Sequence, residues 1–321
     1  MSSIARILPL AKQGVNNYFT KRPFCVSFEI TYRCNARCKH CHLHDIEDKK
    51  IASPKRYGEI CTDIKPVVAQ VSGGEPLLRK DIIQVIKALK RTNRAPYIVL
   101  TTNGVLLKRE KYYQLRETGV DEFSLSLDYP DERHDEFRGV PGLFNRIEKL
   151  MEELNCGNDK AITISCVIQR DNYRNLINIA ELARRWNIYA NFSTYTWLRT
   201  KNKDLMIPKD EIEEFREIIK NLLDYKRKFK NIRTSAYILR RIPDFFEDEK
   251  IPDCRAGERF FVVNPDGTIS PCGLIIKNYL SRKQLQEDFA KTNTCGECYT
   301  SLRANTEKPL WCLIKDSFGS I

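Results

Sequence analysis

Apolar, β-branched runs alternate with charged stretches of helical period from about residue 25 to about residue 195. The six runs expected to form strands are 25–30, 67–72, 97–101, 122–127, 161–168 and 189–193, and helices are expected near 81–91, 108–117, 142–154 and 173–186. Strands that alternate with helices predict βαβ units and a parallel sheet. In parallel barrels the active site lies at the carboxyl ends of the strands, so the loops that follow the strands are where functional residues are expected.

Three cysteines, Cys34, Cys38 and Cys41, follow the first predicted strand with the spacing C-x3-C-x2-C. Structural zinc sites and ordinary electron-transfer iron–sulfur clusters take four protein ligands. Three thiolates leave one position open for an exogenous ligand, as a catalytic zinc keeps a position for water. The spacing therefore indicates chemistry at a metal centre, with a zinc site or three unrelated thiols as the alternatives.

This cysteine run, with the aromatic His40 directly before its third cysteine, resembles the signature of radical S-adenosylmethionine (SAM) enzymes. The resemblance implies an α/β fold, a partial (β/α)6 barrel, and a 4Fe–4S cluster whose open iron binds SAM. In that family one electron from the cluster cleaves SAM to methionine and a 5′-deoxyadenosyl radical, which abstracts hydrogen from an organic substrate. It also implies an electron donor such as flavodoxin or ferredoxin. The protein would supply binding and orientation for these cofactors.

Two motifs follow the second and third predicted strands, where the family places SAM contacts. Gly73, Gly74 and Glu75 resemble the start of the GGEP motif, whose backbone and glutamate hold the methionine amino group. Glycine lets a backbone approach a ligand closely, and a glutamate can accept hydrogen bonds from an ammonium group. Asn103 resembles the asparagine of the family's TNG element at the barrel rim.

After the fourth predicted strand, residues 126–139 resemble an S-x-D-G-P … H-D … R-G pattern of the branch with additional C-terminal clusters. The resemblance implies that Ser126 and Arg138 hold the ribose or the carboxylate of SAM. A guanidinium matches a carboxylate bidentately, which suits the arginine to this role. The alternative for Arg138 is a surface ion pair with Asp135 or Glu136. Tyr129 stands where the family usually has glycine, which puts the local turn in question.

A second group of cysteines lies near the C-terminus. Cys254 and Cys272 flank an apolar run and a Pro-Asp-Gly turn that predict a β-hairpin, which would bring these two thiols together. Cys295 and Cys298 add a C-x2-C pair. These four resemble the auxiliary-cluster ligands of SPASM and shorter "twitch" domains, and imply one auxiliary 4Fe–4S cluster.

Two alternatives compete for this second group. The spacing Cys295-x2-Cys298-x13-Cys312 also resembles the auxiliary motif of the molybdopterin-precursor cyclase, in which three cysteines leave an iron open to substrate. We favour the hairpin pair because Cys254 and Cys272 bring their own surrounding motifs. A four-cysteine zinc site is compatible with the same C-x2-C spacing. Cys61, Cys156 and Cys166 are expected to be packed thiols that behave as small hydrophobes.

Composition limits the remaining possibilities. Twelve cysteines and no export signal favour a reducing compartment, so we expect a cytoplasmic protein. The net charge of +12 suits an anionic partner, but lysine and arginine are scattered beside acids, so nucleic acid is not expected. Residues 4–19 have the rhythm of an amphipathic helix, which we expect to pack on the barrel bottom; peripheral contact with a membrane is the alternative, and Pro9 should shorten the helix.

The expected organisation is an N-terminal arm (1–24), a radical SAM partial barrel (25–200), a helical connection (201–250) that includes a long helix over 208–229, and a cysteine-rich auxiliary domain (251–321). We predict a radical SAM enzyme that performs an oxidation or forms a bond, with the auxiliary cluster as electron acceptor. A non-catalytic iron–sulfur or zinc protein on a decayed barrel is the competing class. Lipids, sugars or aminocyclitols, and ribosomal peptides are the candidate substrates.

Overall fold

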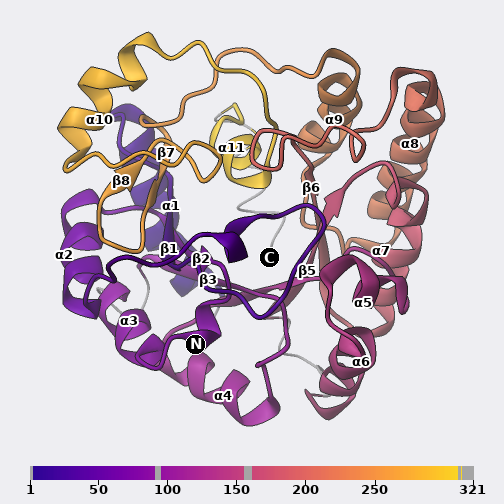
Figure 1. The fold of residues 1–321 in the computed structure, drawn as a ribbon, viewed down its shortest axis with the longest axis horizontal. Helices are drawn as coiled ribbons and strands as arrows, with labels where there is room; N and C mark the ends of the chain where they lie inside the picture. Colours follow the sequence, from indigo (N-terminus) through magenta and orange to yellow (C-terminus); the bar gives the residue numbers. More distant parts are fainter. Residues whose placement is uncertain (1–2, 91–94, 155–160, 310–311, 313–321) are drawn as a thin grey trace.

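The computed structural model describes residues 3–90, 95–154, 161–309 and 312, with side chains from residue 9 onward. Cys156 lies outside these ranges. The predicted parallel sheet is confirmed: β1 (Cys25–Thr31), β2 (Val68–Gly73), β3 (Tyr97–Thr102), β4 (Glu122–Ser126), β5 (Ile162–Ile168) and β6 (Tyr189–Thr194) pair in sequence order, all parallel. The curved sheet with helices outside it is the expected partial (β/α)6 barrel (Figure 1).

The helices that connect β1 to β6 lie on the outer face of this sheet (Figure 1). The helix bounds are α1 Ser3–Phe19, α2 Pro54–Ile64, α3 Ile82–Leu89, α4 Arg109–Thr118, α5 Arg133–Arg138, α6 Leu143–Leu154, α7 Leu176–Arg185, α8 Ile212–Phe229, α9 Ala236–Asp248, α10 Arg282–Asp288 and α11 Ser301–Thr306. Of these, α1, α3, α4, α6, α7 and α8 correspond to predicted helices within a few residues, and α9 falls within the expected helical connection. Helices α2 and α5 were not predicted.

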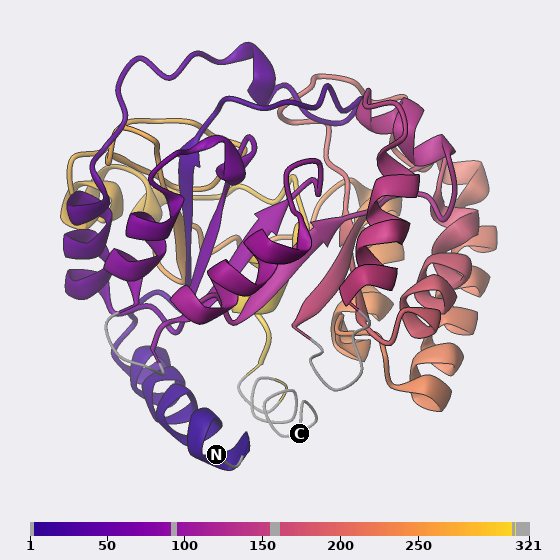
Figure 2. The same ribbon diagram turned by 90° about the horizontal axis from the view of Figure 1, so that it is seen from below.

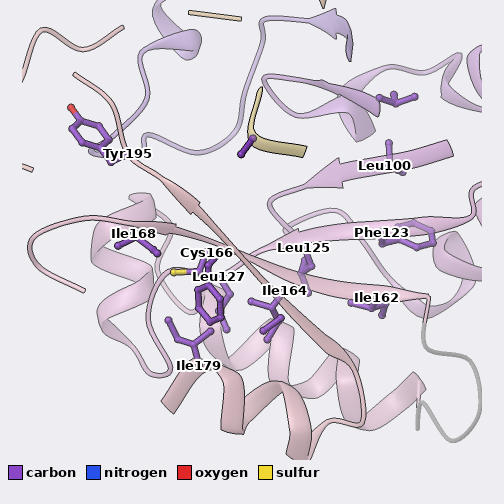
Figure 3. Packing of buried hydrophobic residues seen from close by; sticks show 14 of the residues in the cluster. Leu100, Phe123, Leu125, Leu127, Ile162, Ile164, Cys166, Ile168, Ile179 and Tyr195 are labelled. Atoms are coloured by element: carbon purple, nitrogen blue, oxygen red, sulfur yellow. The ribbon is translucent and has the colours of Figure 1, made fainter. Parts of the chain in front are cut away.

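Side chains along the strands divide the barrel into an apolar outside and a polar inside. In β2, Ala69 and Val71 are buried toward the helices, whereas Gln70 and Ser72 are only half-buried. The same alternation holds in β3 and β4, as period-2 side-chain geometry requires. Figure 3 shows the resulting core, in which Leu127, Cys166 and Ile179 of α7 lie together. The polar inner positions leave a barrel interior suited to a polar ligand.

The predicted β-hairpin of the cysteine-rich segment is present, and it joins the barrel sheet. β7 (Phe260–Val263) and β8 (Ile269–Ser270) pair antiparallel across the turn, and β7 also pairs in parallel with β1. The sheet therefore has eight strands in the order β6-β5-β4-β3-β2-β1-β7-β8. Because β1 has neighbours on both sides, all seven of its residues are buried.

Helix α1 lies at the end of the barrel opposite to the loop that follows β1 (Figure 2). Asn17 is buried and donates to the carbonyls of Pro23 and Lys65, which precede β1 and β2. The expectation that Pro9 shortens this helix is wrong, because α1 runs through it. Pro9 is the seventh residue of α1, beyond the first turn, so the helix continues past it with one backbone hydrogen bond fewer. Within the described residues, no helix has the length and apolar character needed to cross a membrane.

Candidate active site

The first cysteine loop follows β1 at the carboxyl end of the sheet. Cys34, Cys38 and Cys41 are all half-buried there. Two backbone hydrogen bonds hold this loop against the end of α5: Arg37 N–H donates to Arg138 O (2.9 Å), and Lys39 N–H donates to Phe137 O (3.0 Å). The ring of His40 stacks on that of Phe137 with a centroid distance of 5.0 Å.

The two glycines after β2 allow the loop that carries them to pass very close to the first cysteine loop. A Cβ on Gly73 would lie 2.2 Å from the carbonyl oxygen of Thr31, and one on Gly74 would lie 2.2 Å from that of Arg33. Gly74 N–H donates to Thr31 O (2.7 Å) and Glu75 N–H donates to Arg33 O (2.9 Å). The close approach that we expected toward a ligand is therefore an approach to the cysteine loop itself.

Glu75 is buried and connects the ends of β2 and β3. Its Oε1 accepts from the hydroxyl of Thr102 (2.8 Å) and from Leu77 N–H (3.1 Å), and its Oε2 accepts from Asn103 N–H (2.7 Å). Burial raises the pKa of this carboxyl to about 7, against the lowering effect of these hydrogen bonds and of Arg138. Both oxygens already have protein donors, so Glu75 fixes the relative position of two loops.

Asn103 reaches the first cysteine of the loop. Its side-chain amide donates to Asn35 Oδ1 (2.8 Å) and lies 3.8 Å from the sulfur of Cys34. Its Oδ1 accepts from Val105 N–H (3.0 Å), which fixes the orientation of the amide. Hydrogen bonds to cluster sulfurs and ligands are one of the ways in which a protein tunes an iron–sulfur centre.

Arg138 is buried, and the surface ion pair considered for it is wrong. Its guanidinium pairs with Asp128 through Nη2 (2.6 Å) and Nε (2.7 Å), and its Nη1 donates to the sulfur of Cys38 (3.5 Å). Asp135 instead accepts from backbone N–H groups, and Glu136 pairs with Lys39. Arg138 thus places a fixed positive charge beside one of the three thiols.

Asp128 itself is held from several sides. Its Oδ1 accepts from Val167 N–H (3.0 Å), and its backbone N–H donates to Nδ1 of His134 (3.2 Å). Ser126 ends β4 nearby and is half-buried. The substitution of tyrosine for glycine at 129 leaves the turn intact, since the ring packs edge-on against Phe137 and its hydroxyl accepts from Gln169.

The four cysteines of the second group line one cavity of about 210 Å³ between the hairpin and the barrel, namely Cys254, Cys272, Cys295 and Cys298. Burial, together with the neighbouring thiols, raises the pKa of Cys272 to about 11 and that of Cys298 to about 12. The hairpin therefore brings together thiols from three separate stretches of sequence, as expected.

Arg303 holds this second group in place, although nothing in the sequence singled it out. It is fully buried on α11, and its Nη1 donates to the carbonyls of Cys298 (2.6 Å) and Gly296 (3.3 Å). Its Nη2 donates to the carbonyls of Ile251 (2.7 Å) and Pro252 (2.8 Å). One guanidinium thus ties the segment before Cys254 to the loop that carries the C-x2-C pair.

Cys312 is also buried, and its backbone N–H donates to Pro309 O (2.9 Å). It is not among the residues that line the cavity of the other four thiols. In the described part of the chain, no three His, Cys, Asp or Glu side chains converge as ligands of a single metal ion would. The donor chemistry nevertheless fits clusters: three thiols with hydrogen-bond donors on Cys34 and Cys38 in one place, and four thiols around a cavity in the other.

Comparison with known proteins agrees with this geometry. The model of the radical SAM superfamily matches residues 28–183, which include the first cysteine loop, the paired glycines and Arg138. The protein is a member of the radical SAM superfamily. It is an enzyme of that superfamily, whose members use SAM and a 4Fe–4S cluster.

Similarity of this radical SAM enzyme to other proteins extends beyond the matched domain. An AdoMet-dependent heme synthase of Oleidesulfovibrio alaskensis is 27% identical over 79% of this chain and 71% of its own length. The PqqA peptide cyclase of Bradyrhizobium diazoefficiens is 26% identical over 78% and 66%. The crystal structure of Streptococcus suis SuiB bound to the precursor peptide SuiA superposes with a TM-score of 0.63, at 20% identity, over 96% of this chain and 71% of SuiB, a likeness of fold.

Replacement of Gly74 by alanine should destabilise the protein and disturb the first cysteine loop. The new Cβ would meet two backbone oxygens, those of Arg33 at 2.2 Å and Tyr32 at 2.5 Å, and backbone cannot rotate away. We expect a loss of at least about 1–3 kcal/mol in the free energy of unfolding, measured by urea titration. Gly142→Ala is the control, because its Cβ meets only the end of Arg146 at 3.8 Å, and its positive φ alone should cost about 1–2 kcal/mol. A smaller effect at Gly74 than at Gly142 would contradict the crossing of the two loops.

Proposed function

We propose that this radical SAM enzyme oxidises an organic substrate. Cys34, Cys38 and Cys41 hold the SAM-cleaving cluster, and a second, fully ligated 4Fe–4S cluster is held by Cys254, Cys272, Cys295 and Cys298. The observation that carries the proposal is the cavity of the second thiols, which is also lined by residues of β1 and β2, the strands that lead into the first cysteine loop and the paired glycines. When bound, the two clusters and SAM would supply one-electron cleavage of SAM to a hydrogen-abstracting radical, and an acceptor for the electron that the resulting substrate radical gives up.

The residues proposed for SAM binding are Gly73, Gly74, Glu75, Asn103, Ser126 and Arg138. They stand at the carboxyl ends of β2, β3 and β4 or on α5, around the first cysteine loop. Arg138 has unused donor hydrogens beyond those engaged by Asp128 and Cys38, since a guanidinium carries five. These can bind a carboxylate or a hydroxyl of SAM. Glu75 supports the pocket by fixing the backbone of Asn103.

Four thiolates around the second centre would complete its coordination and keep substrate off the metal. The positive charge of Arg303 lies beside this group: Arg303 lowers the pKa of both Cys254 and Cys298, against burial. Arg303 also pairs with Glu307 (2.9 Å), but its net effect on both thiols is that of a cation. A nearby cation stabilises the reduced, more negative state of such a centre and so favours acceptance of an electron. This supports a role as electron acceptor, and hence a net oxidation.

The candidate substrates are still lipids, sugars or aminocyclitols, and ribosomal peptides. The relatives carry names as different as heme synthase, GTP cyclase and peptide cyclase, so their names do not select one. One observation supports peripheral contact with a membrane through α1: its apolar residues Val15 and Phe19 are 44% and 71% exposed. Product analysis of the anaerobically reconstituted enzyme with peptide, sugar or aminocyclitol, and lipid candidates tests these classes.

Iron content of single variants tests the second cluster. The anaerobically reconstituted protein should hold about eight irons per chain, the sum of two four-iron clusters. Cys254→Ala should lower the iron content through loss of the second cluster. Cys312→Ala should leave about eight irons, because Cys312 lies outside the cavity of the four thiols. The reverse pattern would establish three-cysteine ligation with an iron open to substrate. Zinc in place of iron after strictly anaerobic purification would reject both versions.

A further inference from the structure

The cavity of the second thiols is lined by a charged pair that is not among the residues proposed to hold a cluster or SAM. It is lined by Glu29 of β1 and by Arg199, which follows β6, together with apolar side chains that include Leu198, Val262 and Ile275. Glu29 is only 6% exposed, and the side chain of Arg199 is 17% exposed. A carboxylate and a guanidinium thus face the same enclosed space from opposite edges of the six parallel strands.

This pair is poorly satisfied by the protein. The nearest approach is 3.8 Å, between Glu29 Oε1 and Arg199 Nη2, whereas the Asp128–Arg138 pair makes contact at 2.6 Å. Within the described residues, Oε2 of Glu29 and Nε of Arg199 are buried without a hydrogen-bond partner. Removal of such groups from water costs several kcal/mol unless something replaces the lost hydrogen bonds. A ligand that bridges Oε2 and Nε would replace them without displacing the existing contact.

The position of the pair relates it to both cysteine groups. Glu29 lies five residues before Cys34, and its partner in β2 is Ser72, which directly precedes the paired glycines. On the other side, a Cβ on Gly273, the residue after Cys272, would lie 2.7 Å from Glu29 Oε1. A ligand held by this pair therefore lies between the first cysteine loop and the second thiol group, where hydrogen abstraction and electron release could both reach it.

We infer that Glu29 and Arg199 bind a zwitterionic α-amino-acid unit of the substrate, with its ammonium on Glu29 Oε2 and its carboxylate on Arg199. The inference rests on the proposed function, since it names the substrate group for that site. A dipolar ligand is required because one wall of the cavity offers an acceptor and the other offers a donor. The apolar side chains around the pair suit the side chain of such an amino acid. Each charged group of the ligand would make one charge-assisted hydrogen bond that the free protein lacks.

The test measures binding of three small probes to the full-length, anaerobically reconstituted protein by isothermal titration calorimetry. SAM is present at saturation and no reductant is added, so the SAM site is filled and no turnover occurs. The probes are L-leucine, N-acetyl-L-leucine, which lacks the ammonium, and L-leucinamide, which lacks the carboxylate. We expect L-leucine to bind about tenfold or more tightly than either analogue, the loss that follows removal of one charge-assisted hydrogen bond.

Two variants that each remove one charge assign the charges. Glu29→Gln should abolish the preference for L-leucine over N-acetyl-L-leucine, and Arg199→Gln should abolish its preference over L-leucinamide. Arg133→Gln, which removes a half-exposed surface guanidinium, is the matched control and should change neither preference. Iron content and circular dichroism establish that each variant is folded.

Each outcome decides the inference. It is overturned if L-leucine does not bind, if all three probes bind equally, or if the preferences survive in both variants. Release of 5′-deoxyadenosine after addition of dithionite, measured on the same samples without probe, tests the proposed function separately. A protein that cleaves SAM but shows no preference among the probes contradicts the amino-acid site alone, whereas a protein that does not cleave SAM contradicts the proposed function.

Discussion

A chain in which Cys34, Cys38 and Cys41 are all replaced by alanine is expected to lose SAM cleavage to the background level and to keep about four irons, those of one cluster. The three thiols are the candidate ligands of the first centre, and the hydrogen bonds of Asn103 and Arg138 reach the sulfurs of two of them. The measurement is 5′-deoxyadenosine released with SAM and dithionite, together with iron analysis of the same anaerobic sample.

A packed thiol provides the matched control for this experiment. Cys61 of α2 is buried and directs its sulfur to the carbonyl of Leu89, away from both cysteine groups. Cys61→Ala should therefore retain about eight irons and full cleavage, at a modest cost in stability. Cleavage that persists in the triple variant would remove the first centre from this loop.

Replacement of Asp128 by alanine is expected to lower the free energy of unfolding by about 3–5 kcal/mol, the cost of leaving a buried charge without its partner. Arg138 would lose both contacts of its bidentate pair while staying enclosed. We also expect weaker SAM binding, because the released guanidinium no longer has a fixed position beside Cys38. Urea unfolding and equilibrium dialysis of SAM measure the two effects.

The exposed pair between Asp131 and Arg133 is the control, since it has the same chemistry three residues away. The side chains of Arg133 and Asp131 are 53% and 39% exposed, and Asp131→Ala should cost no more than about 1 kcal/mol. Equal costs for the two alanine variants would show that the protein tolerates an unpaired Arg138, and would argue against its role as a fixed positive charge.

Acid should weaken the buried pair as well. Burial alone would raise the pKa of Asp128, but Arg138 and neighbouring groups outweigh it and hold the pKa below its ordinary value. A carboxyl whose pKa is lowered by folding stabilises the protein above its unfolded pKa of about 3.9, and this contribution is lost as the pH falls through the folded value. The difference in stability between the native protein and Asp128→Ala should therefore shrink on acidification.

The elements that sequence periodicity defines well were predicted well. The six barrel strands were placed within one or two residues, since in each a short run of apolar residues, continuous or alternating with polar ones, is followed by a polar loop. Helix α2 was missed because it carries Tyr57, Gly58 and Cys61 on its buried face, where aliphatic residues would have given a clearer pattern. The hairpin was recognised from its Pro-Asp-Gly turn, but a turn does not reveal which strand lies beside β7.

The site was predicted where motifs are local and missed where contacts are remote. The cysteines and the paired glycines are adjacent in sequence, and resemblance located them. The sequence suggests acids on the same helix as partners of Arg138. Its partner is Asp128, because the arginine points inward from the end of α5. Glu29 and Arg199 come from opposite ends of the barrel sequence, so no local motif links them. Arg303 donates to backbone carbonyls, which every residue has, so the sequence does not mark its partners.

The parallel pairing of β1 with β7 has a consequence for how the chain must be made. Cys25 pairs with Phe260, so β1 completes its hydrogen bonds only after most of the polypeptide has left the ribosome. Until then a nascent barrel presents a buried-type strand as an open edge, which is the kind of surface that seeds strand exchange between chains. Synthesis that stops before residue 260 would therefore yield aggregation-prone fragments. The cysteine-rich segment thus covers the open edge of β1 at the end of synthesis, and it also carries the second thiol group.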